Sequence, residues 1–160
     1  MADDIVHEAT YPLPPEAVWQ AIATKPGLDA WLMENDFVEA KVGHRFSFRD
    51  KPRPFWDGVC PCEVVEADPP RRFALRWNVG KDKSPSLVSF TLTPTPDGGT
   101  RLEFRHGGLA GFMGLLMKKG MDKGWAQMVR RSIPMVAQRL RDTGAAPPRA
   151  EVKAAAKAKA

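Results

Sequence analysis

Apolar and polar residues alternate along several segments of this chain, and each such segment predicts a β-strand with one buried face. The clearest alternation places Phe73, Leu75 and Trp77 between polar or small residues. Comparable patterns predict further strands over residues 5–11, 45–49, 59–67, 88–92 and 101–106. The apolar positions would gather on one inner face, formed by Phe46, Phe48, Phe73, Leu75, Trp77, Val88, Phe90, Leu92, Leu102 and Phe104.

A different apolar spacing predicts a helix over residues 15–23, where Val18, Trp19 and Ile22 share one face. Two prolines immediately before this face suit a first helical turn, because that turn needs no backbone donor from them. Trp19 is expected to pack between this helix and the sheet. A short apolar turn or helix should follow over residues 28–32.

The last helix is predicted near the C-terminus, where Pro134 removes one hydrogen bond and bends it. Its apolar residues recur at helical spacing: Trp125, Met128, Val129, Ile133, Val136 and Leu140. The order of elements is then strand, helix, a run of strands and a long helix. We therefore expect an α+β fold with one long helix lying across a curved antiparallel sheet. No βαβ alternation is visible, which argues against a nucleotide-binding α/β fold.

The composition fits a single globular domain. At 160 residues the chain can bury roughly two thirds of its unfolded surface, and 43% hydrophobic with 27% charged residues excludes disorder and a membrane-spanning protein. The longest uncharged run, residues 106–117, is shorter than the ~18 residues of a spanning helix. The first residues are acidic and lack an apolar stretch, so we expect a cytoplasmic protein without membrane insertion.

The net charge of +5 is concentrated at the C-terminal end. Residues 145–160 carry four basic residues and one acidic residue, a net +3, which leaves +2 for residues 1–144. The Ala/Lys-rich segment 145–160 has no apolar face, so we expect a flexible, solvated tail after a domain at 1–144. A nucleic-acid role would depend on this tail alone, and the nearly balanced domain argues against nucleic acid as a partner.

The sequence contains no complete catalytic or metal-binding set. Cys60 and Cys62 would share a strand face, where a disulfide across one residue is badly strained, so both are expected to be free thiols. The three histidines lack the spacing of a metal site, and no cofactor is expected. Glu63 and Glu66 should lie on opposite faces of their strand, so only one could point inward. We therefore predict no catalytic residue.

Motifs spanning residues 5–140 resemble, in the same order, the activator of Hsp90 ATPase homologue-like branch of the START-like (SRPBCC) superfamily. They include the proline-led first helix, Val42-Gly43 before Phe46, the segment from Asp68 through Trp77, and Lys123-Gly124-Trp125 in the last helix. His44, the Cys60-Pro61-Cys62 segment and Pro134 depart from the family pattern. The resemblance implies a helix-grip (START/Bet v 1-like) fold, in which a sheet wraps around a long C-terminal helix.

The resemblance also implies an apolar cavity between sheet and helix. We hypothesise that it binds a small hydrophobic or aromatic molecule; the alternatives are a chaperone regulator or other partner-binding module, and a cyclase-like or aromatase-like enzyme. The sequence favours binding over catalysis and leaves the oligomeric state open. The candidate cavity residues are Trp31, Phe48, Trp56, Phe73, Trp77, Phe90, Phe104, His106, Phe112, Met117, Met121 and Trp125.

Two of these expectations carry explicit alternatives. The glycine-spaced apolar run at residues 107–117 suits a mobile lid over a hydrophobic opening, or else forms the first turns of the last helix. His106 is placed on the inner face by its alternation with Phe104 and Leu102. It could orient a ligand or transfer a proton, or it could simply bond a neighbouring group.

Phe55 and Trp56 lie in a loop that could border a cavity mouth.

Overall fold

The computed structural model describes residues 4–54, 56–79, 83–109 and 111–158, apart from the side chains of residues 79, 111–115, 117 and 158. It confirms the α+β class and the helix-grip arrangement. The elements in chain order are β1 (Ile5–Tyr11), α1 (Pro15–Ile22), α2 (Lys25–Trp31), β2 (Glu34–Asn35), β3 (Arg45–Arg49), β4 (Val59–Asp68), β5 (Arg72–Val79), β6 (Ser84–Pro94), β7 (Thr100–Gly107), α3 (Gly111–Gln127), the π-helical segment η1 (Met128–Ser132), α4 (Ile133–Thr143) and α5 (Arg149–Ala158).

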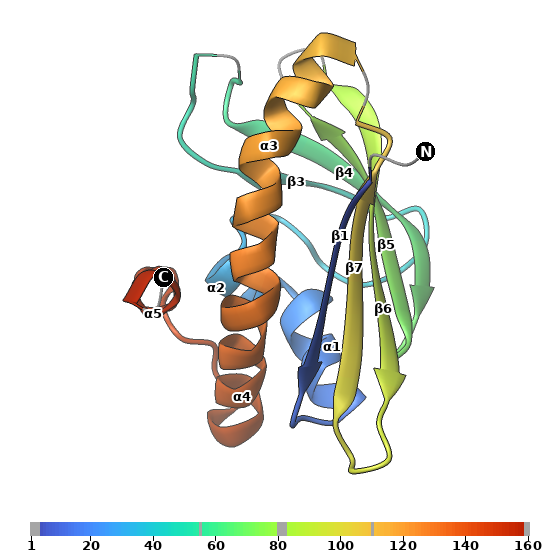
Figure 1. Cartoon of the computed structure of the whole chain (residues 1–160), viewed down its shortest axis with the longest axis vertical. Coiled ribbons are helices and arrows are strands. Elements are labelled where there is room, and N and C mark those ends of the chain that lie inside the picture. Colours follow the sequence, from blue (N-terminus) through green and yellow to red (C-terminus); the bar gives the residue numbers. More distant parts are fainter. Residues whose placement is uncertain (1–3, 55, 80–82, 110, 159–160) are drawn as a thin grey trace.

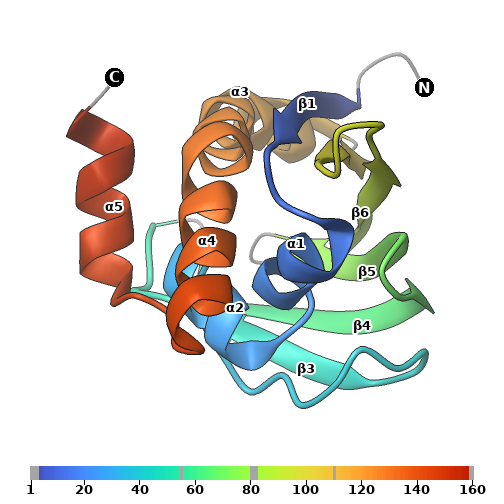
Figure 2. The ribbon, with the colours of Figure 1, turned by 90° about the horizontal axis from the view of Figure 1, so that it is seen from below.

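The strands form one antiparallel sheet in the order β1-β7-β6-β5-β4-β3-β2. The sheet curves around the helices and does not close (Figures 1 and 2). All ten side chains predicted for its inner face are buried, with at most 5% exposure. The alternation of apolar and polar residues therefore identified the concave face of the sheet.

A β-bulge in β4 makes one sequence expectation wrong. The pairing between β4 and β5 shifts between Val64 and Glu66, so that Val65 is an extra residue. Glu63 and Glu66 consequently lie on the same, outer face, where Arg76 and Arg72 donate to them at 2.8 Å. Neither carboxylate points toward the core.

The long C-terminal helix runs from α3 through η1 to α4 along the concave face (Figure 1). It begins at Gly111, so residues 111–117 are its first turns rather than a separate lid loop. At the other end α1 packs against α4 and the sheet, and Trp19 meets Phe73 edge to face at 5.7 Å between ring centroids, as expected. Within the described residues, no helix is long and apolar enough to cross a membrane.

Pro134 explains the π-helical turn in this helix. The amide of Ile133 donates to the carbonyl of Met128, five residues earlier. In this pattern the next carbonyl, that of Val129, would be paired by residue 134, but proline has no N–H. The hydroxyl of Tyr11, which is buried in β1, donates to the Val129 carbonyl instead. Burial raises the pKa of this hydroxyl, so it remains a donor.

Removing the Tyr11 hydroxyl should leave the Val129 carbonyl without a hydrogen-bond donor. We expect Tyr11→Phe to lower the free energy of unfolding by about 1–2 kcal/mol, because a buried carbonyl loses its donor. In the Pro134→Ala background the helix can supply its own N–H, so the same change should cost clearly less. Urea unfolding of the four proteins of this double-mutant cycle measures the coupling. Costs that simply add would contradict the link between Tyr11 and Pro134.

The expectation of a flexible tail is wrong for residues 149–158. They form α5, which packs crosswise outside η1 and α2 (Figures 1 and 2). Val152 and Ala156 are buried in this contact. Gln127 donates to the carbonyl of Ala156 at 3.0 Å, and Glu151 pairs with Arg139. One valine and one alanine at i, i+4 spacing are enough to dock a short helix whose other residues face water.

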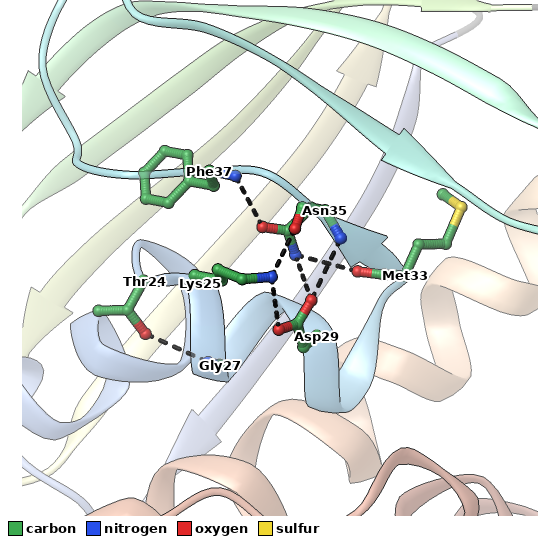
Figure 3. Close-up of polar contacts among 7 residues, drawn as sticks. All are labelled: Thr24, Lys25, Gly27, Asp29, Met33, Asn35 and Phe37. Atoms are coloured by element: carbon green, nitrogen blue, oxygen red, sulfur yellow. Dashed lines mark hydrogen bonds and ion pairs between the residues drawn. The ribbon is translucent and has the colours of Figure 1, made fainter.

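A polar cluster around the buried side chain of Asn35 joins α2 to β2 (Figure 3). The side chain of Asn35 donates to Asp29 at 2.9 Å and to the carbonyl of Met33 at 3.0 Å, and it accepts from the amide of Phe37 at 3.0 Å. Lys25 binds the other carboxylate oxygen of Asp29 at 3.0 Å. Every polar atom of the Asn35 side chain that can pair is thus engaged within the protein, so we assign this cluster a structural role.

Candidate functional site

Aromatic side chains form one continuous cluster between the sheet and α3. Trp125 of α3 lies at its centre, 4.3 Å from Phe104 and 5.4 Å from Trp77 between ring centroids. Trp31 of α2 meets Trp125 from the side of α1 and α2, at 6.3 Å. Phe48 stacks on Trp77 at 5.1 Å. The predicted apolar face of the last helix is therefore correct, and Trp125 anchors this helix to the sheet.

The structure brings most of the candidate residues together. Eight are joined through ring contacts and are at most 4% exposed: Trp31, Phe48, Phe73, Trp77, Phe90, Phe104, His106 and Trp125. Trp56 and Met121 are half-buried at the edge of this cluster. The side chains of Phe112 and Met117 lie outside the described residues.

His106 is held by two buried side chains. Its Nδ1 accepts a hydrogen bond from the indole N–H of Trp125 at 3.2 Å. Its Nε2 lies 2.8 Å from the hydroxyl of Ser86, and that hydroxyl donates to the carbonyl of Trp77 at 2.6 Å. Because the proton of Ser86 is used on Trp77, Nε2 must carry the imidazole proton and donate to Ser86. The chain of bonds therefore fixes a neutral imidazole in one tautomer.

Burial reinforces this neutral state. It lowers the pKa of His106 to about 4, although the carboxylate of Asp4 acts in the opposite direction. Both ring nitrogens are engaged within the protein, so a ligand or a reacting group would have to displace Trp125 or Ser86 to reach either. In this arrangement the hydrogen bond to Nδ1 of His106 orients the indole ring of Trp125.

Sequence reasoning missed Ser86, although a signal for it exists. Ser86 shares the inner row of β6 with Val88 and Phe90 and is 6% exposed. A hydroxyl in such a row needs a buried partner, and the inward-facing His106 is the nearest one by register. A polar residue at a core position was therefore the available clue.

Half-buried apolar side chains border the aromatic cluster at one end of the sheet. They are Trp56 before β4, Leu109 after β7 and Met121 in α3. The strands β5 and β7 end here, where β4 and β6 begin and α3 starts (Figure 1). The indole N–H of Trp56 donates to the carbonyl of Val59 at 2.9 Å, which fixes the ring beside β4. We call Trp56, Leu109 and Met121 the apolar rim.

The two cysteines do not add chemistry to this site. Both are buried and unbonded to each other, as free thiols. The thiol of Cys60 donates to the carbonyl of Asn78 at 3.3 Å, and burial raises the pKa of Cys62. Among the described residues, no three His, Cys, Asp or Glu side chains lie close enough together to hold a metal ion.

A polar hollow of about 500 Å³ lies on the outer face of the sheet, away from the aromatic cluster. Arg45, Glu63 and Arg76 line it, and Glu63 pairs with both arginines. Its charged, solvent-exposed lining does not suit an apolar molecule. The apolar rim and the cluster behind it are therefore the candidate site.

The comparisons with known proteins agree with this architecture. Residues 12–136 match the family model described as activator of Hsp90 ATPase homolog 1-like protein. The crystal structure of MLL2253 from Mesorhizobium loti is 33% identical, with a TM-score of 0.72 over 88% of this chain and 98% of that one. BH1534 from Bacillus halodurans is 29% identical, with a TM-score of 0.65 over 87% of this chain and 94% of that one.

The fold alone is also shared with the Aha1 dimer of Colwellia psychrerythraea. That protein is 23% identical and has a TM-score of 0.61 over 77% of this chain and 87% of that one. No match was found among curated proteins. The match from residue 12 to residue 136, together with a sheet that grips the helix carrying Trp125, shows that the chain belongs to the activator of Hsp90 ATPase homolog 1-like family.

Proposed function

We propose that this protein binds a small apolar or aromatic molecule between α3 and the end of the sheet. The observation that carries the proposal is the apolar rim: three half-buried side chains that pack against the hydrophobic core. Trp77 and Trp125 of that core, which meet edge to face, would form the aromatic floor of the site. Sites for such ligands are mostly apolar and concave, with few polar groups. The polar groups nearest this floor, His106 and Ser86, are satisfied within the protein.

Glycines in α3 support a helix that moves to admit the ligand. A methyl group added at Gly120 or Gly124 would meet nothing within 4 Å, apart from the helix's own backbone, so close packing does not require either glycine. Each glycine costs a helix about 1 kcal/mol relative to alanine. The two glycines that lower helix stability lie between the start of α3 and Trp125, and Gly120 is next to the rim residue Met121.

Binding fits the site better than catalysis does. General acid–base catalysis needs a titratable group within reach of the substrate, and the pKa of buried His106 is lowered while both its nitrogens are engaged. Glu63 and Glu66 face outward. A cyclase-like reaction would require a second titratable group at the rim.

A role as a chaperone regulator is the second candidate, favoured by the matching family, whose name refers to activation of the Hsp90 ATPase. It would act through the surface of the protein and would not need an open rim. Pull-down of a purified Hsp90-type chaperone, with its ATPase rate as readout, separates this role from ligand binding.

Ligand binding can be tested with 1-anilinonaphthalene-8-sulfonate, an anionic probe with an apolar aromatic ring system. We expect saturable enhancement of the probe's fluorescence, and at least tenfold weaker binding in Met121→Trp, because the larger ring fills the rim. Leu87→Trp adds the same ring at an exposed site on the outer face, and it should leave the affinity unchanged. Equal affinity in all three proteins, or no saturation, would contradict the proposal.

A further inference from the structure

Charge is divided unevenly between two parts of the molecule, which we call its two layers: residues 1–110 and the C-terminal helices. Residues 1–110, which hold the sheet, α1 and α2, contain thirteen basic and sixteen acidic residues, a net −3. Residues 111–158, which hold the C-terminal helices, contain ten basic and three acidic residues, a net +7. Lys159 completes the formal +5. The positive charge thus belongs to the whole C-terminal helical layer and not to a tail alone.

The two layers also differ in how their charges are paired. On the sheet most arginines meet a carboxylate, as Arg72 meets Glu66 and Arg101 meets Glu8. On the helices the acids are already engaged: Asp122 binds His7, Asp142 binds Gln138 and Glu151 binds Arg139. Seven cations there have no ion-pair partner among the described residues. One of them, Arg141, lies near the end of α4; we call the other six, on α3, η1 and α5, the basic face: Lys119, Lys123, Arg130, Arg149, Lys153 and Lys157.

Two helices bring these cations together. Lys119, Lys123 and Gln127 follow at i, i+4 spacing and so lie on one face of α3. The side chain of Gln127 donates to the carbonyl of Ala156 in α5. Arg130 follows within a turn of Gln127. On α5, Arg149, Lys153 and Lys157 form a second stripe at i, i+4, i+8, beside the buried stripe that docks the helix. Helix α5 crosses the long helix (Figure 2), and the Gln127–Ala156 contact at this crossing brings the two stripes toward each other.

We propose that the basic face binds the phosphate backbone of double-stranded nucleic acid. Four of its six residues are lysines, which are depleted at protein interfaces, whereas a phosphodiester backbone needs only positive charge. The apolar stripe of α5 is buried, so this helix presents no apolar face to a bilayer. Trp125 is also buried, so no aromatic side chain described in this layer offers a stacking platform for single-stranded bases.

The test measures binding of the full chain to a fluorescein-labelled 30-base-pair DNA duplex by anisotropy, between 50 and 200 mM salt. The triple variant Lys119→Gln, Lys123→Gln and Lys153→Gln should bind more than tenfold more weakly at 100 mM salt. Its slope of log affinity against log salt should be smaller by about 3, since each phosphate contact contributes roughly 0.9. The control variant Lys41→Gln, Arg49→Gln and Lys51→Gln removes the same charge from exposed positions outside the helical layer and should behave like the wild type.

Three results would overturn the proposal. One is the absence of duplex binding at 50 mM salt. Another is equal weakening by both triple variants, which would indicate a response to net charge alone. The last is tighter binding to poly-glutamate, or to vesicles of phosphatidylcholine and phosphatidylglycerol, than to the duplex, which would point to an acidic protein or a membrane. Because none of these readouts involves the apolar rim, the result is independent of the proposed ligand binding.

Discussion

Replacing Trp125 by alanine is expected to lower the free energy of unfolding by about 3–5 kcal/mol, the usual cost of deleting a buried aromatic side chain. Trp125 is 3% exposed and contacts Trp31, Trp77 and Phe104 at once. Its loss would leave a cavity between α3 and the sheet. It would also leave Nδ1 of His106 without its donor.

Urea unfolding measures this cost, and two further variants make it interpretable. Trp125→Phe keeps an aromatic ring but loses the indole N–H, so its cost should lie between that of alanine and zero. Leu116→Ala changes an exposed residue of the same helix and should stay within about 0.5 kcal/mol of the wild type. A similarly small effect of Trp125→Ala would contradict the role of Trp125 as the anchor of α3.

Lowering the pH from 6.5 to 4 is expected to remove about 3 kcal/mol of stability through His106. Below pH 6.5 the unfolded chain binds a proton at this histidine, whereas the folded chain, in which burial lowers the pKa to about 4, does not. Protons therefore favour the unfolded state, and the free energy of unfolding falls as the pH falls through this window. Each unit of pKa difference corresponds to about 1.4 kcal/mol.

Comparison with His106→Gln isolates this contribution from other titrating groups. The variant should be less stable at pH 7, but it should lose less stability between pH 6.5 and 4 than the wild type does. In the wild type, ¹⁵N chemical shifts should report a neutral His106 with its proton on Nε2 down to about pH 5. Titration near pH 6.5, or equal pH dependence of both proteins, would contradict the assigned hydrogen-bond chain.

Much of the fold could be predicted because burial on one side of a strand leaves a direct pattern in the sequence. Phe73, Leu75 and Trp77 are buried as their alternation predicted. The last helix presented the predicted face, with Trp125, Val129 and Ile133 all buried. The motif order added the helix-grip arrangement, which the periodicity alone could not distinguish from other sheet-and-helix packings.

Features that depend on a single extra residue or a weak docking contact could not be predicted in this way. The bulge at Val65 reverses the face of Glu66, and strict alternation cannot reveal it. Helix α5 docks through Val152 and Ala156, too small an apolar stripe to stand out in an Ala/Lys-rich segment. The partners of His106 come from β6 and α3, so its neutral state follows only from the packed structure.

Tryptophan indole signals in a ¹H–¹⁵N correlation spectrum, followed while 1-anilinonaphthalene-8-sulfonate is added, test the proposed site most directly. The indoles of Trp56 at the rim and of Trp77 and Trp125 in the floor should shift saturably with one common affinity. The indole signal of Trp19, a residue of α1 that packs on Phe73, should not shift and serves as the internal control. Shifts at Trp19 as large as those at Trp56, or no saturable shift at the rim, would contradict ligand binding between α3 and the sheet.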